Sequence, residues 1–317
     1  MTKALNLIIL LFILSIAKSA PKKVVIYQDH VYKVVDYPSN NGKYIRMLST
    51  VSAIEENLGH GFINLNNLDH LLLPYVKLLV SSLYFFQQPV KRVLLVGLGV
   101  GSLARAFRTV LTHEDLRIDI VEIDAKIEEL ARKYFFFEQH PRQRIFIEDG
   151  FEFIMNYTNI DVDDESITKY DLIILDAIND LKEDICAPES FLAEAFLLKL
   201  RDMLSERGVL AVNTLPSYCS RHVRERNGYQ RVFGRVYAAS YDINKIFWLF
   251  KDQKDVMNGI SKDKMDQFKR MFTTMDINTN WLKRVFDHEV QIYTKPLFSS
   301  SVTYLFEYTF LNNKCLF

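Results

Sequence analysis

The chain has 317 residues, of which 49% are hydrophobic and 25% are charged, and its formal net charge at pH 7 is zero. This length allows one large domain or two unequal ones, and the composition excludes a disordered or fibrous chain. The balanced charge gives no overall electrostatic footprint for nucleic acid, so no nucleic-acid partner is predicted. The cysteines, Cys186, Cys219 and Cys315, form no CxxC or Cys/His ligand set, and no metal site is predicted.

Residues 1–19 have the pattern of a secretory signal peptide. Lys3 precedes a mostly apolar stretch over residues 5–17, and the tripeptide Ala17-Lys18-Ser19 suits cleavage after its serine. We predict a secretory-pathway or secreted protein with no stable membrane span after cleavage, because the apolar run is short for a bilayer. A signal anchor with a cytosolic body is the alternative, since more lysines follow the run. On the secretory route, Asn156-Tyr157-Thr158 is a glycosylation acceptor.

Residues 20–66 are predicted to form a small β domain. The bursts VVIYQD, VYKVVDY and KYIRML are rich in β-branched and aromatic residues, and turn residues such as Asn40-Asn41-Gly42 separate them. This pattern is typical of an antiparallel meander. Residues 68–86 then follow a helical pattern that is apolar on most sides, with Pro74 at its start or at a kink.

The next part, residues 67–256, alternates strands with helices. Continuous apolar runs separated by amphipathic helices are typical of a parallel sheet covered on both faces. The predicted fold is therefore α/β, a Rossmann-like mostly parallel sheet with helices on both faces, preceded by the small antiparallel β domain. The predicted strands span 92–98, 117–124, 144–150, 170–176 and 208–215, and the helices span 102–111, 125–135, 151–157 and 188–204.

The last part of the chain has weaker patterns. Residues 244–250 predict a late strand that closes one edge of the sheet. Residues 257–317 are predicted as a C-terminal extension with helical segments and a strand at 291–298.

Glycines and carboxylates stand at the ends of four consecutive predicted strands. Ligands of such sheets bind at the carboxyl ends of the strands, so these residues form the candidate site. Taken singly, each could be a turn glycine or a helix cap, but the ordered set favours a cofactor site. The strand ends carry, in chain order, Gly97, Gly99 and Gly101, then Glu122, then Asp149 and Gly150, then Asp176.

The glycine loop narrows the choice of cofactor. A nicotinamide fingerprint would place a third spaced glycine where Ser102 stands, and no GK[ST] follows for a P-loop. The pattern suits an adenosyl group without a pyrophosphate, because the following helix then has less need to bind an anion. We expect Glu122 to accept the ribose hydroxyls. Asp149 is expected to accept from the adenine amino group, and Asp176 to lie near the reacting end.

The ordered series VLLVGLGVGS, VEID, EDG and YDLIILD resembles the class I S-adenosylmethionine-dependent methyltransferases. It is similar to their spermidine-synthase-like branch, in which a small β domain precedes the sheet, and especially to the C-terminal domains of the methyltransferase-like protein 13 family. The resemblance covers roughly residues 25–255. It implies S-adenosyl-L-methionine as cofactor, held by the seven residues of the candidate site. It also implies methylation of protein amines, including on translation elongation factor 1-alpha, and is compatible with a dimer.

Two alternatives to a protein methyltransferase stay open. Aminopropyltransferases of this branch begin a D-x-x-D-P motif at the fourth-strand acid, whereas here the stretch is Asp176-Ala-Ile-Asn179-Asp180. Residues 68–86 also lack the expected Tyr-His-Glu cluster, so polyamine synthesis is disfavoured. Asp176 and Asp180 are predicted as the catalytic carboxylates, which orient an amine or take its proton. The second alternative is a catalytically inactive secreted domain of the same fold.

Overall fold

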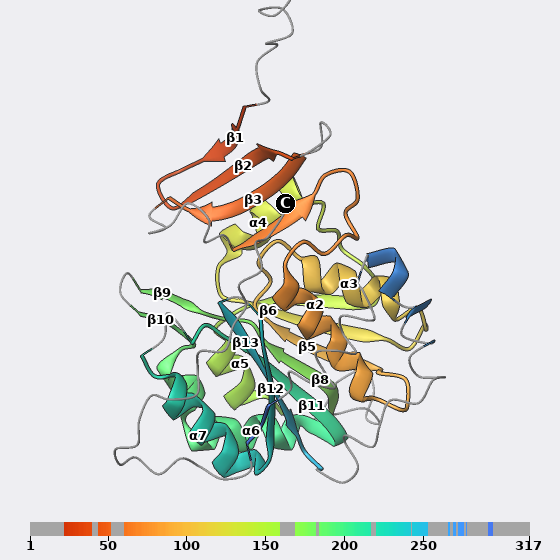
Figure 1. Ribbon diagram of the computed structural model, residues 1–317, viewed down its shortest axis with the longest axis vertical. Helices are drawn as coiled ribbons and strands as arrows, with labels where there is room; N and C mark the ends of the chain where they lie inside the picture. Colours follow the sequence, from red (N-terminus) through yellow and green to blue (C-terminus); the bar gives the residue numbers. More distant parts are fainter. Residues whose placement is uncertain are drawn as a thin grey trace, which may run out of the picture. The chain divides into compact units, whose positions relative to one another are not determined.

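The computed structural model describes most of the region from residue 22 to residue 252. The chain divides into two compact units, Met1–Asn67 and Leu68–Phe317, and each unit has its own sheet (Figure 1). The described residues are 22–39, 44–51, 60–158, 169–181, 184–216, 220–241, 243–252, 266, 269–270, 272–275, 277 and 291–293.

A four-stranded antiparallel sheet forms the first unit. Its strands, in chain order across the sheet, are β1 (Val24–Gln28), β2 (Tyr32–Pro38), β3 (Tyr44–Thr50) and β4 (Gly61–Asn64). Asp36 and Arg46 stand opposite each other on β2 and β3 and form a bidentate ion pair, with N–O distances of 2.7 and 2.8 Å. The predicted small antiparallel sheet is confirmed, with β4 as an additional strand. The predicted Asn40-Asn41-Gly42 turn lies outside the described residues.

An eight-stranded sheet forms the centre of the second unit, in the order β14-β12-β13-β11-β8-β5-β6-β7. The pairings from β11 to β7 are parallel, whereas β11, β13, β12 and β14 are joined by antiparallel pairings. The predicted Rossmann-like, mostly parallel sheet is confirmed. Its strands are β5 (Arg92–Val96), β6 (Arg117–Glu122), β7 (Gln143–Ile147), β8 (Tyr170–Leu175), β11 (Leu204–Thr214), β12 (Val236–Tyr241), β13 (Asn244–Phe250) and β14 (Gln291–Tyr293).

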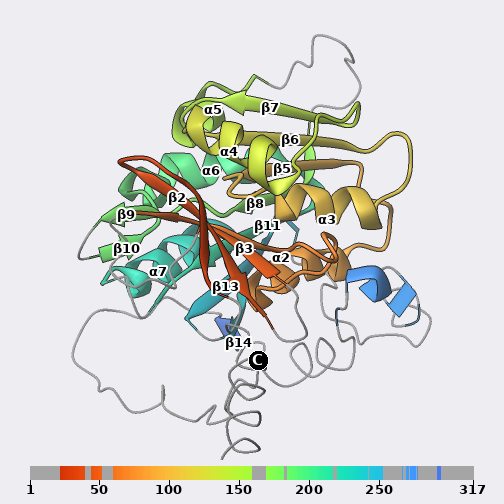
Figure 2. The same ribbon diagram turned by 90° about the horizontal axis from the view of Figure 1, so that it is seen from above.

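Helices cover both faces of this sheet (Figures 1 and 2). One group joins α2, α3 and α4, because α2 contacts α3 and Arg105 of α3 donates to the carbonyl of Phe135 at the end of α4. The other group joins α5, α6 and α7, each in contact with the next. The bounds are α2 (Pro74–Val80), α3 (Ser102–Val110), α4 (Ala125–Phe135), α5 (Gly150–Asn156), α6 (Glu194–Met203) and α7 (His222–Phe233).

Several predicted boundaries differ from the observed ones. The helix predicted from residue 68 begins at Pro74, since proline fits the first helical position where no N–H bond is needed. It continues as the 3-10 helix η2 (Ser81–Phe85), and the helix predicted from residue 188 begins with the 3-10 helix η3 (Glu189–Leu192) before α6. Strand β13 does not close an edge, because β12, which the sequence analysis did not predict, and β14 lie beyond it.

Two further predictions concern parts that the structure covers incompletely or not at all. The predicted signal peptide, residues 1–19, lies outside the described residues, as does most of the extension from residue 257 onward. Among the residues that are described, no helix is both long enough and apolar enough to cross a membrane.

Candidate functional site

The glycine loop after β5 adopts a backbone that other residues rarely adopt. Gly97, Gly99 and Gly101 have φ values of +103°, +53° and +81°. A Cβ on Gly97 would come within 2.4 Å of the carbonyl oxygen of Asp176, and one on Gly101 would come within 2.6 Å of Phe137. The glycines therefore let the loop pass close to the end of β8 and to the residues that follow α4.

This close approach gives a direct prediction for Gly97→Ala. The left-handed backbone and the clash with a fixed carbonyl should lower the free energy of unfolding by at least about 1–3 kcal/mol, measured by thermal or urea unfolding. Gly228→Ala is a matched control, because Gly228 lies inside α7 and its added Cβ would meet the nearest atom at 3.6 Å. The control should be neutral or stabilising by up to about 1 kcal/mol.

The side chain of Glu122, at the end of β6, binds the backbone of the glycine loop. It is 8% exposed. Its Oε2 accepts from the N–H of Leu98 at 2.9 Å and its Oε1 from the N–H of Asp124 at 3.0 Å. Burial raises the pKa of Glu122, and these two donors oppose that effect. Each carboxylate oxygen has a second lone pair, so the predicted contact with ribose hydroxyls is compatible with this geometry and stays a prediction.

Ile123 was not predicted as a site residue, but in the structure its apolar side chain is exposed next to Glu122. It follows Glu122 directly and is 67% exposed, although the last five residues of β6 before it are all buried. This exposed apolar side chain lies beside the carboxylate that is predicted to bind the ribose, so it is a candidate contact for the adenine base. The available signal was the apolar residue inside the acidic triplet Glu122-Ile123-Asp124.

Asp149 is the N-cap of α5, and its Oδ1 accepts from the N–H groups of Phe151 at 2.7 Å and Glu152 at 3.2 Å. The alternative that an acid at this strand end is a helix cap is therefore confirmed for Asp149. Gly150 starts the helix, and a Cβ there would lie 2.7 Å from Val96 of β5. The predicted contacts of these two residues with the cofactor are not tested by this geometry.

Asp176 follows β8, and its carboxylate is held by side chains from β11 and α2. Asn213 of β11 donates Nδ2 to Asp176 Oδ1 at 2.8 Å, and Asn244 of β13 donates Nδ2 to Asn213 Oδ1 at 2.9 Å. Tyr75 of α2 forms a side-chain hydrogen bond with the same carboxylate. Burial raises the pKa of Asp176 to about 6, and the bonds from Asn213 and Tyr75 moderate that rise.

The sequence patterns did not predict Tyr75, Asn213 or Asn244 as site residues. Tyr75 lies in the segment where the Tyr-His-Glu cluster was expected, and its hydroxyl bonds to the Asp176 carboxylate. Burial and the neighbouring carboxylate raise the pKa of Tyr75 well above its ordinary value, so its hydroxyl keeps its proton. A signal for the two asparagines was available in the sequence, since Asn213 follows the apolar run of β11 and Asn244 precedes the apolar run of β13.

The second predicted catalytic carboxylate, Asp180, lies in the short hairpin of β9 (Asn179–Leu181) and β10 (Asp184–Cys186). Its backbone pairs with Ile185. Its side chain is outside the described part of the structure, so its predicted role with Asp176 stays a prediction.

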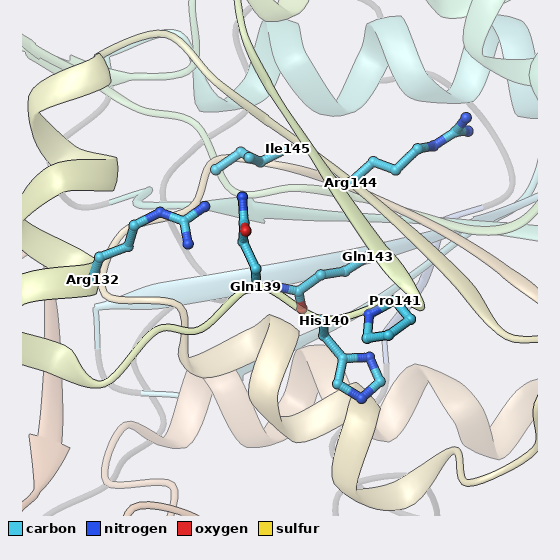
Figure 3. A pocket seen from close by; sticks show the side chains of 7 residues that line it. All are labelled: Arg132, Gln139, His140, Pro141, Gln143, Arg144 and Ile145. Atoms are coloured by element: carbon cyan, nitrogen blue, oxygen red, sulfur yellow. The ribbon is translucent and has the colours of Figure 1, made fainter.

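One cavity of the protein lies away from this edge of the sheet. A cavity of about 520 Å³ lies beside the start of β7 and contains none of the predicted site residues. Its cations already have partners, since Arg132 pairs with Glu128 and Arg144 with Asp119. We therefore place the functional site by its side chains and not by cavity size. Figure 3 shows the lining residues, which are Arg132, Gln139, His140, Pro141, Gln143, Arg144 and Ile145.

The chemistry of the strand ends defines the class of ligand. The segments EID, EDG and DAI contribute carboxylates, and neither they nor the loop GLGVG contributes a cation. A diphosphate would be repelled by such a set, whereas a neutral nucleoside that carries a cationic group would be attracted. The fold and the site therefore define a Rossmann-like protein whose carboxyl edge suits an adenosyl sulfonium.

Comparison with known proteins agrees with this class. Residues 73–226 match the family model of the spermine/spermidine synthase domain. The chain is 27% identical over 220 residues to the polyamine aminopropyltransferase of Vibrio vulnificus, which is 69% of this chain and 64% of that protein. It is 32% identical over 168 residues to the eEF1A lysine and N-terminal methyltransferase homolog of Drosophila melanogaster, which is 52% of this chain and 24% of that protein. The chain thus spans less than two thirds of either relative.

Solved structures share the fold. The crystal structure of human methyltransferase-like protein 13 in complex with SAH has a TM-score of 0.54 at 23% identity and covers 65% of this chain and 94% of that chain. A probable spermidine synthase from Corynebacterium glutamicum has a TM-score of 0.59 at 17% identity and covers 90% of this chain and 99% of that chain. The predicted resemblance to the spermidine-synthase-like branch of S-adenosylmethionine-dependent methyltransferases is confirmed.

Proposed function

We propose that the protein is an S-adenosylmethionine-dependent methyltransferase that methylates an amine of a protein substrate. The observation that carries this proposal is the Asp176 carboxylate, which is held between Tyr75 and Asn213 beside the glycine loop and has a pKa raised to about 6. A carboxylate of this kind suits the reacting end of a site for a cationic cofactor and an amine.

The residues of the carboxyl edge fit the cofactor. Glu122 would hold the ribose, Ile123 would contact the base, and the loop from Gly97 to Gly101 would pass beneath the adenosyl group. S-adenosylmethionine, when bound, supplies a methyl group on a sulfonium, which is a good leaving group. The protein then has to align the acceptor and exclude water, which are tasks of positioning.

Asp176 has a specific task in this proposal. A protonated amine has no lone pair to offer, so the acceptor must lose a proton before it reacts. A carboxylate with a pKa of about 6 is mostly ionised at pH 7 and can orient the amine and accept its proton. Tyr75 and Asn213 fix the direction of that carboxylate.

The choice of a protein amine over a polyamine rests on the sequence departures and on the relatives. The D-x-x-D-P motif is replaced by Asp176-Ala-Ile-Asn179-Asp180. Matches at 32% and 34% identity are to eEF1A lysine and N-terminal methyltransferases of Drosophila melanogaster and Mus musculus. Aminopropyl transfer is the second candidate, because the Vibrio relative carries that name.

Calorimetry of the purified protein with S-adenosylmethionine and with its decarboxylated form tests both candidates. Binding of S-adenosylmethionine, followed by transfer of labelled methyl to eEF1A or its N-terminal peptide, is the expected result. A preference for the decarboxylated form, with product formed from putrescine, would favour the aminopropyltransferase. If neither compound binds, the remaining interpretation is a catalytically inactive domain of the same fold.

Glu122→Ala provides a second measurement on the bound cofactor. The lost contacts to two ribose hydroxyls should weaken S-adenosylmethionine binding by about 1–3 kcal/mol, since the hydroxyls are left unpaired. Calorimetry measures this directly. Glu129→Ala is the control, because Glu129 pairs with Lys126 on the exposed side of α4. This variant should bind S-adenosylmethionine as tightly as the wild type does. Equal affinity in the Glu122 variant would show that the ribose lies elsewhere.

We further propose that the chain enters the secretory route and is cleaved after Ser19. The pattern of residues 1–19 supports this, and so does the acceptor tripeptide, whose Asn156 and Thr158 are both exposed where α5 ends. Expression in animal cells, followed by fractionation and N-glycosidase treatment, is the test. A mobility shift that Asn156→Gln abolishes is expected. A cytosolic, unglycosylated chain would contradict the proposal.

A further inference from the structure

A row of side-chain hydrogen bonds crosses three neighbouring strands and ends at Asp176. The first bond runs from Asn244 Nδ2 on β13 to Asn213 Oδ1 on β11, at 2.9 Å. The second runs from Asn213 Nδ2 to Asp176 Oδ1 after β8, at 2.8 Å. The sheet order β13-β11-β8 places these residues side by side, although Asn213 is 37 residues from Asp176 along the chain.

The bond from Asn244 determines which end of the Asn213 amide faces Asp176. A carboxamide has an acceptor oxygen at one end and a donor NH₂ at the other. While Asn244 donates to the oxygen of Asn213, the NH₂ of Asn213 is the end that faces Asp176. If the amide turned over, its oxygen would face a carboxylate oxygen, which disfavours the ionised form of Asp176. Donation to a carboxylate favours the ionised form.

From this geometry we propose that Asn244 is a positioning residue, which orients the Asn213 amide and thereby keeps the Asp176 carboxylate ionised and aimed at the acceptor amine. The inference rests on the proposed function for the amine, but the effect of Asn244 on the carboxylate can be measured without catalysis. Asn244 acts through Asn213 and needs no contact with substrate.

The other neighbours of Asp176 do not duplicate this effect. Tyr75 of α2 is the titratable side chain that faces the carboxylate among the described residues, and it keeps its proton because burial raises its pKa. From β11 and β13 the facing groups are the two neutral amides, and from β5 the facing group is the backbone at Gly97. Burial raises the pKa of Asp176, so the donors are what keep it near 6.

The test compares Asn244→Ala, Asn213→Ala and the double variant with the wild type. NMR titration of the Asp176 carboxyl and the acid limb of the kcat profile are both measured. Loss of one charge-assisted hydrogen bond corresponds to a pKa increase of about 1–2 units, expected for Asn213→Ala. Asn244→Ala should raise it by about 0.5–1 unit, which lowers kcat at pH 7 up to about twofold and leaves kcat at pH 9 unchanged.

Thr214→Val is the matched control. Thr214 neighbours Asn213 on β11 and its hydroxyl donates to the backbone of Lys245 on β13 at 3.0 Å, so the variant also removes a side-chain bond between these strands. It should not move the titration of Asp176. If Asn244 only joined the two strands, Asn244→Ala and Thr214→Val would have the same effect on the titration of Asp176.

The double variant decides whether Asn244 acts through Asn213. The expected shift equals that of Asn213→Ala alone, because the relay is already broken. A shift equal to the sum of the single shifts, or an Asn244→Ala titration that matches the wild type, would overturn the inference. If the titrations shift as expected but no amine is methylated by the wild type, the proposed function fails and the relay to the carboxylate stands.

Discussion

Asp176→Asn is expected to lower kcat for methyl transfer by a factor of about 10² to 10⁴, the range typical of a lost general base, and to change cofactor affinity far less. The variant keeps the shape of the side chain, and its carbonyl oxygen can still accept from Asn213 at the position where Oδ1 now lies. The amide cannot take a proton from the acceptor amine. Single-turnover rates with labelled cofactor, together with calorimetric affinity, separate these two effects.

The pH dependence of the wild type gives an independent check on Asp176. Its carboxyl group has a pKa of about 6 because it is buried, and only its ionised form can accept the proton. The rate should therefore fall as the pH drops through about 6 and reach a plateau above it. The Asn variant should lose this acid limb. A variant that retains wild-type kcat, or the same limb, would show that another group takes the proton.

The same substitution should stabilise the fold. The pKa of Asp176 is raised from its ordinary value of 3.8 to about 6, so the folded state binds its proton more tightly than the unfolded state. Stability from this group is therefore greatest below pH 4 and is lost as the pH rises to 6. Near pH 7 Asp176→Asn is expected to raise the free energy of unfolding by up to about 3 kcal/mol. Lower activity with higher stability distinguishes a functional charge from a structural one.

The sheet could be predicted from the sequence because its central strands are continuous apolar runs. Residues 92–96 and 170–175 are buried along almost their whole length, so no other element of this length accommodates them. The predicted strand ends extend too far where acids follow the strand. Asp124 and Asp149 lie just after β6 and β7 and are the N-caps of the next helices. An acid between a strand and a helix is therefore explained by a helix cap as well as by a strand end.

The site could be predicted only as far as it is contiguous in the chain. The glycine loop and the strand-end acids follow one another in a fixed order, and the rule for parallel sheets brings them to one edge. Asn213 reaches Asp176, and Asn244 reaches Asn213, because β8, β11 and β13 are neighbours in the sheet. Strand order is not written in any local pattern. Strand β12 was missed for a related reason, since VYAASY gains its place in the sheet by pairing with β13, which follows it in the chain.

Asp119 is the centre of a buried polar network inside the sheet. It lies inside β6 and is 1% exposed. Its Oδ2 accepts from Tyr170 of β8 at 2.7 Å and from Arg92 of β5 at 3.3 Å, and its Oδ1 accepts from Arg144 of β7 at 2.8 Å. One carboxylate therefore links residues from four neighbouring parallel strands.

Asp119→Ala is expected to lower the free energy of unfolding by about 3–5 kcal/mol, because it leaves the buried guanidinium of Arg92 without this counter-charge. Urea unfolding at pH 7 measures the loss. Asp115→Ala is the matched control, since Asp115 pairs with Lys91 but both side chains are half exposed, and its loss should be much smaller. Because the hydrogen bonds of Asp119 go to Tyr170, Arg92 and Arg144 and not to the glycine loop, the folded fraction of the Asp119 variant should bind S-adenosylmethionine as the wild type does. Equal losses in the two variants would show that water replaces Asp119 as a partner of Arg92.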